Sequence, residues 1–240
     1  MAEKAALVVS AHSGDFVWRA GGAIALYASR GWHMKIVCLS FGERGESAKL
    51  WKESGATLEK VKTQRRAEAK KAAEILGGDI EFFDCGDYPI NFGQEQLFKL
   101  VDVYRDLKPS FILTHPQEDP YNFDHPLASH VAQEARIIAQ APGHKPGGFV
   151  LGAPPLFFFE PHQTEQSNWK PEVFLDITPV WATKRKAFET MAAQEYLWDY
   201  YTRVGLNRGI QAARNSEKKN IVYAEAYQRL FPTIVDKLED

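Results

Sequence analysis

Short continuous apolar runs alternate with segments of helical periodicity along the first two-thirds of the chain. Continuous runs are typical of strands buried on both faces, whereas apolar positions three and four residues apart indicate helices. Strands are therefore expected at residues 6–10, 34–41, 80–83 and 111–114. Helices are expected at residues 21–30, 58–76, 94–107 and about 126–139. The second of these helices should end at Gly77, because glycine adopts the left-handed conformation that commonly terminates helices.

This strand–helix order predicts an α/β fold with a Rossmann-like, mostly parallel sheet and helices on both of its faces. In such sheets, ligands bind outside the carboxyl ends of the strands. We therefore expect a functional site at the carboxyl edge of the sheet.

The last third of the chain is less regular. Frequent Gly and Pro predict a loop over residues 141–155. Two more strands are expected at residues 156–159 and 173–177, followed by helical patterns at residues 183–200 and 224–230. We interpret the strands and helices of residues 150–240 as small C-terminal cap elements on a core of about residues 5–140. Because no linker separates the two parts, we expect a single domain over residues 1–240.

Composition narrows the possible classes of function. With 29 basic and 31 acidic residues, the formal net charge is −2. No global basic excess therefore points to nucleic acid or to a membrane surface as partner. The apolar run near the N-terminus is too short for a signal segment or a membrane span. Cys38 and Cys85 each lie in an apolar run, so buried free thiols and a cytoplasmic location are expected.

Polar clusters follow two of the expected strands. His12 and Asp15 come directly after the first strand, and residues 114–125, ending in His125, follow the fourth. Two imidazoles and one carboxylate leave open positions on a divalent cation, which is typical of catalytic zinc sites. A single histidine in such a loop is more often a hydrogen-bonded surface residue. Two clusters at one sheet edge favour a metal site, although this set of ligands would accept Fe²⁺, Mn²⁺ or Co²⁺ as well.

These clusters resemble the motifs of a known family. The segment Ala-His-Ser-Gly-Asp at residues 11–15 is similar to an Ala-His-Pro-Asp-Asp motif, and residues 122–125 are similar to a motif ending His-Pro-Asp-His. Residues 42–45 resemble a Gly-Glu-Arg-Gly loop, and Arg66 with Glu68 resembles an Arg-x-x-Glu helix with looser spacing. The family is that of the PIG-L/LmbE-like zinc-dependent N-acetylglucosaminyl deacetylases, and the resemblance covers roughly residues 5–140.

The resemblance implies one Zn²⁺ per chain, with His12, Asp15 and His125 as its ligands. His130 competes for the third position, since it lies nearby on the following helix. His125 is preferred because it aligns with the family motif. Asp124 would then orient the site from behind the ligands.

Two departures from the family pattern bear on the chemistry. In the deacetylases the first Asp of the first motif is the general base, and here that position is Gly14. The family's oxyanion-stabilising His corresponds to Asn122. General acid and base groups each contribute about 10²–10⁴-fold in rate. Their loss argues against ordinary deacetylation and for a changed reaction on a retained metal site.

Two other residues could take over proton transfer. Glu46 follows the second strand and is expected at the same sheet edge, although an arbitrary Glu there would more often be a solvated loop carboxylate. His162 follows the aromatic strand at residues 156–159, where a surface turn histidine is an equally good interpretation. Both gain weight because the usual base is missing. We predict that Glu46 and His162 are the catalytic residues.

Candidate residues for binding a small anionic substrate are Arg44, Arg66, Arg208 and Asn122. Guanidinium groups match carboxylates bidentately, which suits such a substrate. For Arg66, a solvated position on a helix face is the stronger alternative.

A closer resemblance spans nearly the whole chain. The segments at residues 119–128 and 208–215, together with residues 11–15 and 42–47, look like those of the bacterial 4-oxalomesaconate (4-carboxy-2-hydroxymuconate) hydratases of gallate and protocatechuate 4,5-cleavage. This resemblance implies a metal-dependent hydratase of a small unsaturated tricarboxylate. A zinc-dependent deacetylase of an N-acetylated amino sugar and a non-catalytic metal-binding protein remain as alternatives. We further expect a homo-oligomer.

Overall fold

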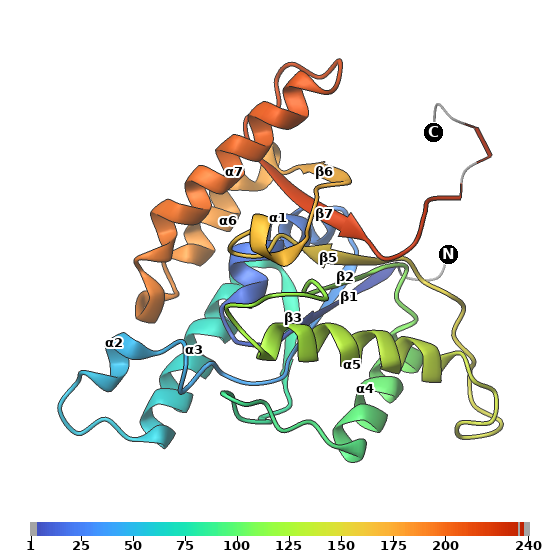
Figure 1. Cartoon of the computed structure of the whole chain (residues 1–240), viewed down its shortest axis with the longest axis horizontal. Coiled ribbons are helices and arrows are strands. Elements are labelled where there is room, and N and C mark those ends of the chain that lie inside the picture. Colours follow the sequence, from blue (N-terminus) through green and yellow to red (C-terminus); the bar gives the residue numbers. More distant parts are fainter. Residues whose placement is uncertain (1–3, 235, 238–240) are drawn as a thin grey trace.

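A computed structural model describes residues 4–234 and 236–237. Its centre is one sheet of seven strands in the order β3-β2-β1-β4-β5-β7-β6 (Figure 1). The strands are β1 Ala5–Ser10, β2 His33–Cys38, β3 Gly78–Phe82, β4 Ile112–Thr114, β5 Leu156–Phe159, β6 Val173–Asp176 and β7 Ala224–Arg229. Neighbours among β1 to β5 are parallel, whereas β7 is antiparallel to both β5 and β6. The mostly parallel α/β fold is thereby confirmed.

Helices cover both faces of the sheet. They are α1 Asp15–Ala28, α2 Ala48–Trp51, α3 Leu58–Leu76, α4 Gln94–Leu107, α5 Asp124–Ala139, α6 Trp181–Phe188 and α7 Leu197–Arg214. Three short 3₁₀ turns complete the elements: η1 Glu165–Ser167, η2 Thr178–Val180 and η3 Ala192–Gln194. In Figure 1, α4 and α5 lie together on one side of the sheet, and α6 and α7 lie on the other.

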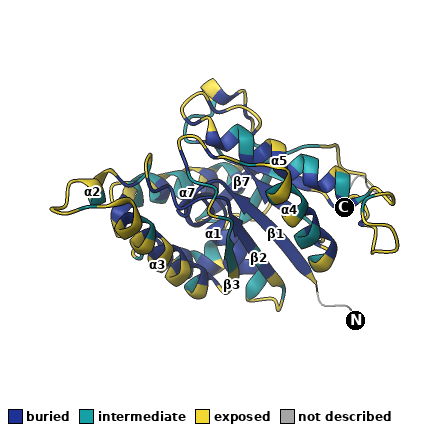
Figure 2. Ribbon diagram, turned by 90° about the horizontal axis from the view of Figure 1, so that it is seen from below, coloured by how far each residue is buried: buried dark blue, intermediate teal, exposed yellow. Residues whose placement is uncertain are grey.

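The central strand β1 contributes side chains to two hydrophobic cores. Ala6 and Val8 pack into the core shared with α1, α3 and α6, while Leu7 and Val9 pack into the core shared with α4 and α5. Successive side chains of a strand point to opposite faces, so a strand covered on both sides must be apolar throughout. All six residues of β1 are buried, as the dark colour of the inner strands in Figure 2 shows.

The expected helix over residues 58–76 is confirmed in full. The side chain of Thr57 accepts a hydrogen bond from the backbone N–H of Lys60, which satisfies one of the free donors at the helix start. Gly77 closes the helix with a φ of 77°, a left-handed conformation that a side chain would strain. Most other strands and helices of the first two-thirds of the chain also form close to their expected ranges, but the first helix begins at Asp15, six residues before the expected start at residue 21, and the second strand ends at Cys38 rather than residue 41.

Two expectations for the last third are wrong. The helical pattern at residues 224–230 is strand β7, which hydrogen-bonds between β5 and β6. The pattern at residues 183–200 is not one helix, because the chain breaks after α6, passes through η3 and begins α7 at Leu197. Ala, Glu, Gln and Arg favour helices locally, but sheet pairing outweighs such weak preferences.

Two further features agree with the composition. Cys38 is buried, Cys85 is partly buried, and both are free thiols. Among the described residues, no helix is long and apolar enough to cross a membrane.

Candidate metal centre

Four side chains from three strand ends converge at the carboxyl edge of the sheet. His12 and Asp15 follow β1, Glu46 lies in the loop after β2, and His125 lies in the first turn of α5 after β4. Each offers one ligand atom, and these atoms all lie within 4.8 Å of one another. The structure thus brings together the three expected metal ligands and one of the two expected catalytic residues.

A carboxylate behind His12 determines which of its nitrogens is free. The Nε2 atom lies 3.1 Å from Oδ2 of Asp124, and Nδ1 lies 3.1 Å from Oε1 of Glu46. Asp124 is held in turn by the backbone N–H groups of Tyr88 and Ile90. If Nε2–H donates to Asp124, the lone pair of Nδ1 is left for a cation, as in carboxylate–histidine–metal arrangements.

His125 is oriented in the same way by a second carboxylate. Its Nδ1 lies 2.8 Å from Oδ2 of Asp119. Its Nε2 atom is buried, has no hydrogen-bond partner among the described residues, and lies 3.5 Å from Oδ1 of Asp15. By contrast, His130 is 74% exposed and pairs only with Glu134, so His125 is the histidine of this helix that reaches the cluster.

The cluster carries an excess of negative charge. Burial alone lowers the pKa of His12, but the carboxylates of Glu46, Asp124 and Asp15 raise that pKa well above its usual range. Burial alone raises the pKa of Asp15, whereas His125 and His115 lower it well below its usual range. Both shifts follow from carboxylates and imidazoles buried against one another, and a positive partner at this point would be favoured.

A divalent cation fits this arrangement. The unpartnered Nε2 of His125 costs free energy in a buried position, and a metal ion would give it a partner. Nitrogen and carboxylate ligands without thiolates suit Zn²⁺ or another borderline divalent ion. The donor set therefore matches a catalytic metal site.

A cavity of about 440 Å³ opens beside the cluster. Asp15, Glu46, His125, Asn122 and His162 all contribute to its wall. Several aromatic side chains complete the wall, namely those of Trp18, Tyr88, Tyr121, Tyr196, Tyr200 and Tyr201. A cavity of this size can hold a small organic acid next to the metal position.

His162 lies in the wall of this cavity and stacks on Tyr200, with ring centroids 4.3 Å apart. Burial and the nearby Arg19 guanidinium lower the pKa of His162. The neutral imidazole is therefore favoured. Asn122 donates a hydrogen bond to the hydroxyl of Tyr88 and accepts one from the backbone N–H of Asp124, so its amide is fixed in the same wall.

The three arginines singled out from the sequence lie elsewhere. Arg44 is 48% exposed and binds the backbone carbonyl of Asp87, and Arg66 is exposed on α3 above the ring of Phe41. Arg208 forms an ion pair with Glu160 on the far side of His162. None of them is part of the wall of the 440 Å³ cavity.

Two other arginines, Arg19 and Arg65, are buried near the metal centre, and of these only Arg19 lines the cavity. Arg19 is buried in the cavity wall, with its Nε 3.4 Å from Oδ1 of Asp15. Arg65 is buried, and its Nη1 donates to Oε2 of Glu68 at 2.7 Å. Arg65 and Glu68, three residues apart, are therefore the Arg-x-x-Glu pair that the sequence interpretation placed at Arg66. The helical period could have identified Arg65, because it shares a face with the buried Val61 and Ala69.

The sequence interpretation also missed His115 and Asp119. The Nε2 of His115 accepts a hydrogen bond from the backbone N–H of Ala11, and its ring stacks 4.2 Å from that of His125. Asp119 orients His125 as described above. Their position at the end of β4 was the available signal, but many polar residues follow that strand.

The α/β fold and the cluster of candidate metal ligands at its sheet edge agree with the family to which comparison with known proteins assigns the chain. The family model described as GlcNAc-PI de-N-acetylase matches residues 7–136, and the chain belongs to this PIG-L family. It is 61% identical over 239 residues to the "4-oxalmesaconate hydratase" of Pseudomonas putida KT2440, covering 98% of this chain and 93% of that protein.

Solved structures agree with this assignment. The crystal structure of the 4-carboxy-2-hydroxymuconate hydratase of Pseudomonas putida KT2440 superposes with a TM-score of 0.96 at 61% identity, covering 98% of this chain and 99% of that one. The N,N'-diacetylchitobiose deacetylase of Pyrococcus horikoshii superposes with a TM-score of 0.77 at 20% identity, covering 95% and 84%. This second likeness shows the shared fold.

Proposed function

We propose that this protein is a metal-dependent hydro-lyase that adds water to a C=C bond of 4-oxalomesaconate (4-carboxy-2-hydroxymuconate), in bacterial breakdown of gallate or protocatechuate. The observation that carries the proposal is the 61% identity to a 4-oxalmesaconate hydratase over nearly the full length of both chains. Function follows from sites rather than folds, so the site must support the same reaction.

The site supports a reaction other than deacetylation. Gly14 stands where the family's deacetylases carry their general base and offers no side chain for proton transfer. Glu46 and His162 both face the cavity, and Glu46 Oε1 lies 3.1 Å from His12 Nδ1 at the metal position. The candidate proton-transfer groups therefore lie in the walls of the cavity and not at position 14, just before α1.

One Zn²⁺ per chain would be held by His12, Asp15 and His125, with Asp124 and Asp119 orienting the two imidazoles. When bound, the ion supplies a Lewis acid that stabilises negative charge developing on the oxo or enol group of the substrate.

Glu46 and His162 divide the two proton transfers of the hydration. The oxygen of water bonds to one carbon of the double bond as one of these residues takes a proton from that water. The neighbouring carbon gains the electron pair of the double bond and takes a proton from the other residue. The two residues then exchange one proton through solvent to return to their starting states, so the reaction consumes only water and substrate.

The charge of the cavity suits an anionic substrate once a metal ion offsets the carboxylates. The Nε–H of Arg19 is buried and has no hydrogen-bond partner among the described residues. We propose that Arg19 binds a substrate carboxylate, with Asn122 as a second polar contact. Guanidinium–carboxylate hydrogen bonds are among the strongest neutral-pH contacts available to a protein.

The test is a spectrophotometric assay of purified, zinc-loaded protein with 4-oxalomesaconate, followed by chelation and metal add-back. We expect metal-dependent loss of the conjugated chromophore and a product heavier by one water. Absence of reaction in protein with confirmed metal content would overturn the hydratase. Release of acetate from an N-acetylated amino sugar would instead favour the deacetylase alternative.

A further inference from the structure

A buried glutamine outside the segment matched by the family model reaches into the metal centre. Gln194 is the last residue of η3, in the break between α6 and α7, and is 3% exposed. Its Nε2 donates to Oε2 of Glu46 at 3.4 Å. The other carboxylate oxygen of Glu46 faces His12. The two oxygens of Glu46 thus have different partners, one at the metal position and one on Gln194.

The orientation of this amide follows from the chemistry of its neighbour. The Nη2 of Arg65 donates to Oε1 of Gln194 at 2.6 Å. A guanidinium group can only donate hydrogen bonds, so the oxygen of the amide must face Arg65 and the NH₂ group must face Glu46. Arg65 itself is held by Glu68 and by the backbone carbonyl of Phe41. Arg65, which is itself held in place, therefore fixes the amide of Gln194, and the NH₂ group of that amide points at Glu46.

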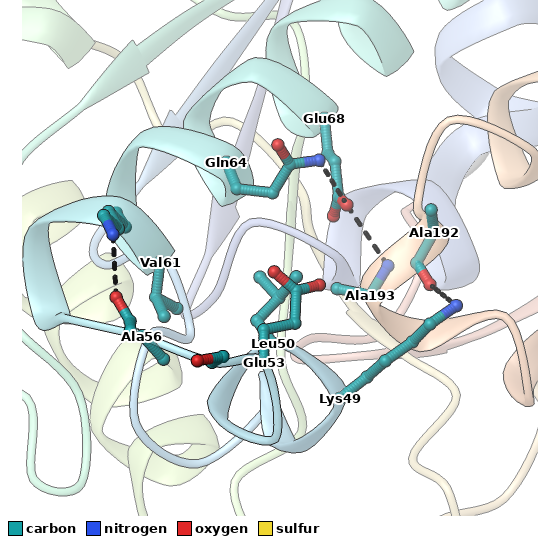
Figure 3. A pocket seen from close by; sticks show the side chains of 12 residues that line it. Lys49, Leu50, Glu53, Ala56, Val61, Gln64, Glu68, Ala192 and Ala193 are labelled. Carbon is teal, nitrogen blue, oxygen red and sulfur yellow. Dashed lines mark hydrogen bonds between the residues drawn. The ribbon is translucent and has the colours of Figure 1, made fainter.

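The backbone that carries Gln194 is anchored from behind. Figure 3 shows a second pocket, between α2, α3 and η3, in which Glu68 accepts hydrogen bonds from the side chain of Gln64 and from the backbone N–H of Ala193. In the same view, Nζ of Lys49 donates to the backbone carbonyl of Ala192. These bonds hold η3 against α3 and α2, directly before the residue that enters the metal centre.

Gly14 provides the space that Gln194 occupies. A Cβ atom at position 14 would lie 2.5 Å from Oε1 of Gln194 and 2.8 Å from Nε1 of Trp18. The φ of Gly14 is −95°, a conformation open to any residue, so the backbone itself does not require glycine here. The requirement is one of volume. A side chain at position 14 would force the amide of Gln194 to shift from its position between Arg65 and Glu46.

We propose that Gln194 is a positioning residue that holds the carboxylate of Glu46 in place for proton transfer. Gly14, which has no side chain, leaves the space that the amide of Gln194 occupies. The amide of Gln194 thus occupies the space that the general base fills in the family's deacetylases. From there it directs the carboxylate of Glu46 toward the reacting atoms. This inference deepens the proposed hydratase function and rests on it.

The test is a double-mutant cycle on kcat. Gln194→Ala should lower kcat by about 10²-fold, the loss associated with a misplacement of about 1 Å, with KM and zinc content little changed. Glu46→Ala should lower kcat by about 10²–10⁴-fold. Adding Gln194→Ala to Glu46→Ala should cause no further loss, because no carboxylate remains to be positioned. As the matched control, Gln140→Ala removes a partly buried amide at the C-cap of α5, whose NH₂ group donates to the backbone carbonyl of Arg136, and should leave kcat unchanged.

Gly14→Ala provides a second cycle. It should displace the amide of Gln194 and lower kcat to a similar extent, and combining it with Gln194→Ala should add little. Near-normal kcat for Gln194→Ala overturns the proposal. So does a further loss of the same size in the Glu46→Ala background, which would indicate a general structural role.

Crystal structures of the zinc-loaded protein and its Gln194→Ala variant give a readout without turnover. We expect the Glu46 carboxylate to leave its position beside His12 in the variant, and an unmoved carboxylate would contradict the proposal. If the unmodified protein fails to hydrate the substrate, the proposed function fails, while this comparison still decides whether Gln194 positions Glu46.

Discussion

One buried cluster of charged side chains contacts the middle of α1 and another lies at its N-terminal end, and the two differ in how completely their polar atoms are paired. In the first, Glu225 on β7 accepts hydrogen bonds from the backbone N–H groups of Gly22 and Ala23, from Nζ of Lys184, and from the hydroxyl of Tyr227. Two of these bonds come from α1, one comes from α6 and one lies within β7, so this cluster ties α1, α6 and β7 together.

The metal centre is arranged differently. Within the described part of the chain, Nε2 of His125 and Nε of Arg19 are buried without hydrogen-bond partners. Buried polar groups are almost always paired, and the exceptions concentrate at functional sites. The comparison shows that burial of charge alone does not identify a site. Unpaired buried atoms point to a ligand where they gather with other candidate ligand atoms, as at this centre. Among the described residues, His144 and Trp169 also carry unpaired buried nitrogens, but these do not line this cavity.

The largest expected effect comes from removing the imidazole of His125, whose buried Nε2 has no hydrogen-bond partner among the described residues. His125→Ala should abolish stoichiometric zinc binding, and with it several kcal/mol of transition-state stabilisation, so that kcat/KM falls by about 10³-fold or more. Metal analysis and the hydratase assay measure both. The metal-free variant should melt near the metal-free protein. A variant that keeps its zinc would exclude His125 as a ligand.

Breaking the paired cluster should instead affect folding. Glu225→Ala leaves Lys184 as an uncompensated buried charge, and such losses cost about 3–5 kcal/mol. Urea denaturation of the metal-free protein measures this change, and the folded fraction should still bind one zinc ion. Unchanged stability would mean that water or a rearranged side chain takes the place of Glu225, and would contradict the comparison.

A smaller effect is expected at Asp119, which contacts the proposed metal ligand His125. Asp119→Asn keeps the size of the side chain but weakens the hydrogen bond that orients His125, and such changes typically cost about 10–100-fold in metal affinity. A competition titration against a zinc chelator measures the affinity. If Asp119→Asn lowers the zinc affinity as much as His125→Ala does, Asp119 is itself a ligand. If the zinc affinity is unchanged, the helix alone orients the imidazole of His125.

The smallest effect is expected at Arg66, whose guanidinium group lies over Phe41 on an exposed helix face. Arg66→Ala should change stability by no more than about 0.5 kcal/mol and leave kcat and KM unaltered. Thermal melts and the same assay provide the check. A rise in KM would return Arg66 to the substrate-binding residues and would place part of the substrate outside the cavity described above.

Local patterns predicted those parts of the site that follow directly from strand ends. His12 and Asp15 come after an uninterrupted apolar strand, and His125 opens a helix after another, so their convergence at one sheet edge could be expected. Glu46 follows from the same reasoning and lies in the cluster. The metal cluster was therefore within reach of sequence reasoning, because parallel strands bring their carboxyl ends to one edge.

The same reasoning did not predict the surroundings of Arg44, Arg66 and Arg208. Each was singled out as a cation near a motif, but the structure gives them local partners or solvent. The residue adjacent in sequence to Arg66, Arg65, points inward instead. A shift of one residue on a helix turns a side chain by about 100°, so proximity to a motif does not determine which side chain reaches a site.

The sequence by itself determined the α/β class and the parallel core, and it predicted the residues that converge at the candidate metal site, because apolar runs, helix periods and motifs at strand ends are local features of the chain. Only the tertiary structure decided the role of residues 183–230. Local propensity favours helices there, yet pairing with β5 and β6 makes β7 a strand, and the break at η3 carries Gln194 into the space left by Gly14. Such positions depend on contacts between residues far apart in the chain (180 positions for Gly14 and Gln194), which no local pattern records.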